Sequence, residues 1–147
     1  ITAVNNAKKA GMSVLTYFMF GNLDETYSDM QETAKFSKSL NSDYTEFSIT
    51  IPYAGTEMYE EALRSKIIDH DYWLEFALRP TPNFKPPQLI ENNVSIREML
   101  ELRDRAVKEY YFRPKYILKE LTKTLSVSEF IKKARMGITL AQSVYRK

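Results

Sequence analysis

The sequence predicts an α/β fold, because strand-like and helix-like segments alternate over its first half and helix-like segments alone fill the second. Residues 12–20 and 44–51 are rich in β-branched and aromatic side chains, as strands are. Between them, residues 26–40 repeat apolar side chains at the spacing of an amphipathic helix. A crossover of this length implies that the two strands run parallel in a right-handed βαβ unit.

The first elements carry local start and stop signals. A helix is expected over residues 2–10 and ends at Gly11, since glycine tolerates the left-handed backbone at a helix end. The run "MSVLTYFMF" over residues 12–20 is almost wholly apolar, which is typical of a strand covered on both faces. The next helix begins at Thr26, whose spacing to Asp29 is that of a capping box.

The second strand, residues 44–51, alternates in polarity and stops at Pro52. Its two faces are expected to carry Phe47, Ile49 and Ile51 on one side and Tyr44, Glu46, Ser48 and Thr50 on the other. A third helix follows over residues 56–66. Two strands are too few for a stable sheet, so we expect the chain to pair with another copy or with strands of a longer polypeptide.

The character of the chain changes after Ile68. Residues 69–93 hold four of the six prolines and predict an irregular linker, with a short helix near Trp73. Three further helices are expected, and their start signals are the capping-box pair Ser95 and Glu98, Pro114 at a first helical position, and the capping-box pair Ser126 and Glu129.

Composition excludes several classes of function. The net charge of the 147 residues is +2, so no strong general attraction to nucleic acid or to an anionic membrane is expected. No apolar run approaches the roughly 20 residues needed to span a bilayer. Cysteine is absent, which excludes disulfides and cysteine-ligated metal clusters within these residues and favours a cytoplasmic location. Because the chain starts at Ile1 rather than at a methionine, inside a predicted helix, we interpret it as a fragment of a longer protein.

A glycine follows each predicted strand, in "GNLDET" and in "PYAGTE". Ligands of parallel α/β proteins bind at the carboxyl ends of strands, so both junctions are candidate sites. The alternative is that Gly21 and Gly55 only make tight turns. Acidic residues at both junctions suit the helix dipole but would repel a phosphate. A ligand with ribose hydroxyls or an ammonium group would suit these junctions better than a nucleotide.

Other candidates have ordinary structural explanations. His70 is the only histidine and is interpreted as a turn or surface residue. No residues show metal-ligand spacing, so no metal ligand is predicted. No catalytic residue is predicted either. The aromatic residues Tyr110, Tyr111 and Phe112, together with Arg113, could stack on bases. Packing of these side chains at a helix end is the preferred interpretation.

Taken together, the motifs resemble the C-terminal half of a radical S-adenosylmethionine barrel. The resemblance is to the branch whose members often carry an N-terminal cobalamin-binding domain, including anaerobic magnesium-protoporphyrin IX monomethyl ester oxidative cyclases. In that branch, a segment A-x-x-A-G, a hydrophobic strand and G-x-P-G-E-T precede a helix, and a second strand ends in P-x-x-G-T before Y-x-x-A. The corresponding segments here are "AKKAGMSVLTYFMFGNLDET" and "ITIPYAGTEMYEEA". Leu23 and Asp24 stand where the family has Pro-Gly.

The resemblance implies which residues bind the cofactor. They are Met19, Gly21 and Glu25 beside the adenosyl group, and Pro52, Gly55 and Thr56 on the next strand. The three cysteines that hold the family's 4Fe-4S cluster would lie upstream of Ile1, as would any cobalamin domain. The fragment alone is therefore expected to bind no cluster and to be inactive.

The resemblance also divides the chain. Residues 1–68 would be the C-terminal βαβα part of a partial barrel, and residues 69–147 a linker and C-terminal helical extension. The intact protein would be an iron–sulfur oxidoreductase or methyltransferase-like enzyme acting on a small-molecule substrate, partnered by its own N-terminal portion. The fragment is expected to self-associate. The alternative function is a non-catalytic helical module for protein–protein interaction.

Overall fold

The computed structural model describes residues 1–84, 91–122, 131–132, 135 and 137–139. The chain is mixed α/β and divides into two compact units, Ile1–Arg103 and Asp104–Lys147. Its elements are α1 (Thr2–Lys9), β1 (Leu15–Phe20), α2 (Tyr27–Ser39), β2 (Tyr44–Ile49), α3 (Glu57–Arg64), α4 (Tyr72–Leu78), α5 (Ile96–Tyr111) and α6 (Pro114–Thr122). The expected division at residue 68 concerns an intact barrel and stays a prediction.

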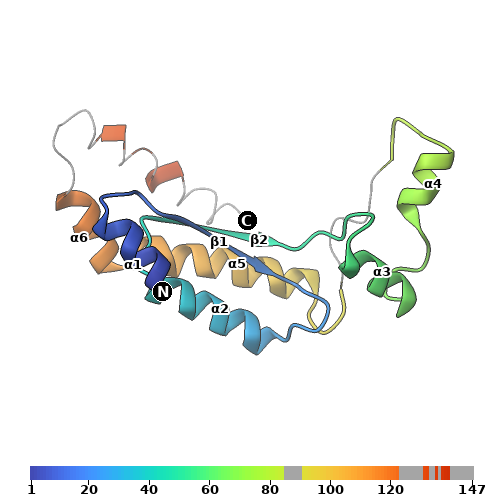
Figure 1. Cartoon of the computed structure of the whole chain (residues 1–147), viewed down its shortest axis with the longest axis horizontal. Helices are drawn as coiled ribbons and strands as arrows, with labels where there is room; N and C mark the ends of the chain where they lie inside the picture. The colour runs from blue at the N-terminus through green and yellow to red at the C-terminus, as the bar shows by residue number, and fades with distance from the viewer. Residues whose placement is uncertain (85–90, 123–130, 133–134, 136, 140–147) are drawn as a thin grey trace. The chain divides into compact units, whose positions relative to one another are not determined.

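The two strands pair in parallel, as expected, with Leu15 opposite Tyr44 and Phe20 opposite Ile49. Figure 1 shows β1 and β2 side by side, with α2 running back along them. One sheet face packs against this helix through stacked rings. The ring centroids of Phe18 and Phe47 lie 5.6 Å apart, and Phe18 meets Phe36 of α2 edge-on at 6.3 Å. Each buried phenylalanine contributes about 1.5–3 kcal/mol of hydrophobic stabilisation.

The described residues leave the other face of the sheet uncovered. It carries three cross-strand pairs, Leu15 with Tyr44, Tyr17 with Glu46, and Met19 with Ser48, which we call the open sheet face. Tyr17 is 66% exposed and Met19 is 51% exposed. The apolar run of β1 predicted a strand covered on both faces. The structure covers only one of them, because no second layer packs on the open sheet face among the described residues. Thr50 also differs from expectation: it is buried just past β2, where its amide donates to the Phe20 carbonyl at 2.8 Å.

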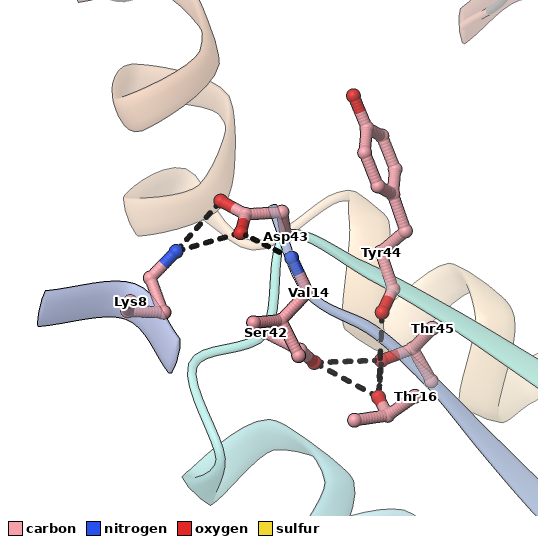
Figure 2. A network of polar contacts seen from close by, with 7 residues as sticks. All are labelled: Lys8, Val14, Thr16, Ser42, Asp43, Tyr44 and Thr45. Atoms are coloured by element: carbon pink, nitrogen blue, oxygen red, sulfur yellow. Dashed lines mark hydrogen bonds and ion pairs between the residues drawn. The ribbon is translucent and has the colours of Figure 1, made fainter. Parts of the chain in front are cut away.

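A polar network joins the amino-terminal ends of the strands to α1 (Figure 2). Lys8 donates to both oxygens of the buried Asp43 carboxylate, at 2.7 and 2.8 Å, and the Val14 amide donates to it at 3.0 Å. Beside it, three hydroxyls lie within hydrogen-bond distance of one another, and they belong to Thr16, Ser42 and Thr45.

The Tyr44 ring points away from these hydroxyls and belongs to the open sheet face (Figure 2). In parallel α/β proteins, binding residues gather at the carboxyl ends of the strands, which is the opposite end of the sheet from this network. The network therefore fixes the base of the sheet.

Helices α3 and α4 make a small core of their own beyond the carboxyl ends of the strands (Figure 1). Tyr59, Ala62 and Ile68 are buried in it, and Leu23 from the β1–α2 turn packs against them. The Tyr59 hydroxyl donates to the Asp71 carboxylate at 2.8 Å. Burial raises the pKa of Tyr59 first, and the bond to Asp71 raises it further. Leu23 therefore connects the first strand–helix junction to the helices that follow the second.

In the unit Asp104–Lys147, aromatic residues pack around the end of α5. The Tyr110 ring is fully buried, and the Arg113 guanidinium lies over it at 4.2 Å from its centroid. Tyr111 and Tyr116 meet edge-on at 5.3 Å. Packing at a helix end is thus confirmed for Tyr110, whose ring is not free to stack on a base. α6 begins at Pro114 as predicted, and the expected capping pair Ser126 and Glu129 lies outside the described residues.

Helices long and apolar enough to cross a membrane do not occur in the part of the chain that the structure describes.

Candidate functional site

The β1–α2 turn is held from within by Glu25. One of its carboxylate oxygens, Oε2, accepts hydrogen bonds from the Gly21 amide at 2.7 Å and from the Asn22 amide at 3.1 Å. The backbone closes the turn a second time, because the Glu25 amide donates to the Asn22 carbonyl at 3.0 Å. Two amides converging on one carboxylate oxygen make charge-assisted hydrogen bonds, which are about twice as strong as neutral ones. Glu25 therefore fixes the path of the chain at the end of β1.

The helix that follows starts with the predicted capping box. The Thr26 hydroxyl accepts from the Asp29 amide at 3.3 Å, and the Asp29 carboxylate accepts from the Thr26 amide at 2.8 Å. The Thr26 hydroxyl also donates to Asp29 at 2.6 Å. These hydrogen bonds favour the charged carboxylate and lower the pKa of Asp29 below its usual range. The capping box gives α2 a fixed start directly after the turn.

Gly21 has two separate reasons to be glycine. Its φ of +86° lies in the left-handed region that side chains disfavour. In addition, an ideal Cβ at position 21 would lie 2.6 Å from the Met99 sulfur and 3.5 Å from a methyl carbon of Ile49. Glycine at position 21 therefore allows α5 to pack closely against the end of β1.

A small, open, shallow pocket lies at this junction. One side is formed by residues 21–23 and Glu25, and the other by residues 92–94 and Met99. The Asn92 side-chain amide donates to the Leu23 carbonyl at 2.7 Å and ties the two sides together. Ligand pockets usually enclose about 300–1,000 Å³, far more than this pocket does, so it can form only part of a site for a drug-sized ligand.

The second junction is built differently. Gly55 has a φ of +77°, but nothing lies within 4 Å of an ideal Cβ there, so its role is conformational. The Thr56 hydroxyl caps α3 by accepting from the Tyr59 amide at 3.3 Å and donates to the Tyr53 carbonyl at 2.6 Å. Pro52 is buried at the end of the strand segment.

The structure brings only two of the predicted site residues into one pocket. Gly21 and Glu25 line it, whereas Pro52, Gly55 and Thr56 do not. Met19 lies on the open sheet face opposite Ser48. The cofactor-binding role of all six residues stays a prediction.

Asn92, Asn93, Val94 and Met99 also line the pocket, and sequence reasoning did not identify them. The capping pair Ser95 and Glu98 correctly predicted where α5 starts. Nothing in the spacing indicated that this start returns to the β1–α2 turn, because the contact joins residues 69 positions apart.

His70 is a half-exposed surface residue between carboxylates. Its Nδ1 lies 2.9 Å from Asp69, and its Nε2 lies 3.2 Å from Glu75. Among the described residues, no three histidine, aspartate, glutamate or cysteine side chains converge as a metal site would require.

The amino-acid sequence of the chain is similar to those of two methyltransferases. It is 31% identical over 121 residues to an uncharacterised methyltransferase of Pyrococcus horikoshii, a match that covers 82% of this chain and 25% of that protein. It is 30% identical over 73 residues to the bacteriochlorophyllide d C-8(2)-methyltransferase of Chlorobaculum tepidum, covering 50% of this chain and 16% of that protein. The chain thus spans a quarter or less of the length of these relatives. No family model and no solved structure matches it.

Proposed function

We propose that this chain is the C-terminal βαβα part of a partial barrel, with a helical extension, in a radical S-adenosylmethionine methyltransferase. The observation that carries the proposal is the match to a methyltransferase over 82% of the chain. The matching length is enough to include both strand–helix junctions. Parallel pairing supports it, since this places both junctions at the carboxyl edge of one sheet, where barrel enzymes bind their ligands.

The first junction is suited to form one wall of a binding site for S-adenosylmethionine. The cofactor carries ribose hydroxyls and an ammonium group, which can donate hydrogen bonds to a carboxylate, and it carries no phosphate for the carboxylate to repel. One oxygen of Glu25 is occupied by the Gly21 and Asn22 amides, and no hydrogen bond to a described residue uses the other oxygen, Oε1. The pocket is too shallow to enclose the cofactor, so other parts of the intact protein would complete the site.

The iron–sulfur cluster does not fit this chain, because the chain has no cysteine. Its ligands, and any cobalamin domain, belong to other parts of the proposed intact enzyme. S-adenosylmethionine supplies the transferable methyl group when it is bound. The residues of this chain would bind and orient the cofactor and exclude water, with Glu25 holding the turn and Met19 offering an apolar surface to a flat ring.

The test is a binding titration on the intact polypeptide that contains this sequence, reconstituted with iron and sulfide without oxygen. We expect S-adenosylmethionine to bind stoichiometrically and S-adenosylhomocysteine to accumulate when substrate is supplied. Glu25→Gln should weaken cofactor binding by about 1.5–3 kcal/mol if the carboxylate contacts the cofactor. A lowered melting temperature with unchanged cofactor affinity would restrict Glu25 to holding the turn.

The alternative function, a non-catalytic helical interaction module, gives a different result in the same titration. It predicts that the intact polypeptide binds no S-adenosylmethionine with or without a cluster. That result would overturn the enzyme proposal.

A further inference from the structure

The open sheet face carries a carboxylate where a parallel sheet normally carries none. Parallel strands are usually covered on both faces and are apolar on both. Glu46 instead lies at the centre of this face, directly opposite Tyr17 in the strand register. Its side chain is exposed and makes no ion pair with a described residue.

The surroundings of Glu46 limit what can cover it. The neighbouring cross-strand pairs on the same face are Leu15 with Tyr44 and Met19 with Ser48. An apolar helix layer or the apolar face of a second copy would bury the Glu46 carboxylate without a partner. Burying an unpaired charge is strongly unfavourable. Whatever covers this face must therefore bring a positive charge or hydrogen-bond donors to Glu46.

The aromatic rings on this face further limit which kind of ligand can cover Glu46. Tyr17 lies across from Glu46, and Tyr44 lies two residues before it on the same face of β2. Tyrosine faces attract cations that have shed part of their water, and a carboxylate adds direct charge complementarity. Leu15 and Met19 supply apolar contact at either end. An organic cation with an apolar body matches this combination better than a hydrated metal ion or an anion.

We propose that the open sheet face lines the substrate cavity and that Glu46 binds an organic cation, an ammonium group attached to an apolar body. This rests on the proposed function, in which a barrel turns this face inward. The side chains of one face lie about 6–7 Å apart along a strand, so Glu46 is one such step from the Met19–Ser48 pair. Glu46 would thus contact a ligand next to the cofactor position assigned to Met19.

Choline is a suitable probe, and 3,3-dimethylbutan-1-ol is its neutral isostere. We would titrate both into the intact protein by NMR and compare wild type with Glu46→Gln. The matched control is Glu32→Gln, which makes the same chemical change at an exposed position on α2. We expect choline to bind wild type at least fivefold more tightly than the neutral isostere and at least fivefold more tightly than it binds Glu46→Gln. Glu32→Gln should behave as wild type.

Equal binding of choline and its isostere, or equal choline affinity in wild type and Glu46→Gln, would overturn the inference. Melting temperatures of the two variants should match wild type, since both side chains are exposed, so a loss of fold cannot imitate the expected result. S-adenosylmethionine titrated in parallel separates the two proposals. Wild type that fails to bind it contradicts the proposed function, whereas wild type that binds it with Glu46-independent choline binding contradicts only the role of Glu46.

Discussion

The sulfur of Met99 occupies the space that a side chain at position 21 would need, 2.6 Å from an ideal Cβ on Gly21. The two residues come from the end of β1 and the first turns of α5. Their contact explains how a helix far along the sequence becomes one side of the pocket at the first strand–helix junction.

Gly21→Ala should destabilise the unit Ile1–Arg103 by about 2–4 kcal/mol, combining a left-handed backbone strain of about 1–3 kcal/mol with the clash against Met99. The double variant Gly21→Ala/Met99→Ala removes the clash but keeps the strain, so its loss should be smaller than the sum of the single losses. Chemical denaturation of the three variants measures this. The matched control is Gly55→Ala, which has similar φ and open space. Additive losses at positions 21 and 99 would show that the contact is unimportant.

Lys8→Met should cost about 1.5–3 kcal/mol, because it removes two hydrogen bonds from the buried Asp43 carboxylate. The Lys8 side chain is 23% exposed and that of Asp43 only 5%, so water screens this pair little. Lys9→Met, on the exposed side of the same helix, should change stability by less than about 0.5 kcal/mol. Thermal melts compare the two. Equal losses would show that the ion pair between Lys8 and Asp43 makes no specific contribution to stability.

Acid should weaken the two capping boxes. Hydrogen bonds from Thr26 lower the pKa of Asp29, and hydrogen bonds from Ser95 lower the pKa of Glu98. A carboxyl whose pKa is lower in the folded state stabilises the fold above its unfolded pKa, and this contribution is lost as pH falls through the folded value. The usual values are 3.8 for aspartate and 4.5 for glutamate.

We therefore expect wild type to melt above Asp29→Asn/Glu98→Gln at about pH 7, and the difference to be smaller at about pH 3. Asp24→Asn, on the exposed turn, is the control and should match wild type at both values. An equally large difference in melting temperature at low pH would show that the shape of the two capping side chains, not their charge, stabilises the helices.

The 147-residue chain alone should self-associate, because its two-stranded sheet leaves both backbone edges unpaired among the described residues. Light scattering over a concentration series should show a rising average mass. Tyr17→Lys should reduce it, whereas Leu118→Lys, at an exposed position of α6, should not. A monomer at every concentration would show that the chain protects its own edges.

Local signals in the sequence predicted local structure well. Thr26 with Asp29 and Ser95 with Glu98 cap their helices as expected, because capping depends only on neighbouring residues. The parallel pairing of the strands followed from the length of the crossover.

The site was predicted only in part. Glu25 was expected to face a ligand, yet one of its oxygens holds the turn. Met99 and Asn92 were missed, because no spacing rule says where a distant helix will pack. The apolar run of β1 also did not indicate which of its two faces these residues cover, because an apolar strand has the same sequence pattern whether its cover lies in these residues or elsewhere.

The bond between Asn92 and the Leu23 carbonyl has a consequence for the order of events during synthesis. Its donor lies 69 residues after its acceptor. At about 5–20 residues per second, the ribosome needs on the order of ten seconds to make that stretch, so the first junction stays unfinished while the strands and α2 are already made. A nascent chain stopped before residue 92 should therefore hold a sheet without its pocket, and protease sensitivity at the β1–α2 turn should fall only once that residue has emerged.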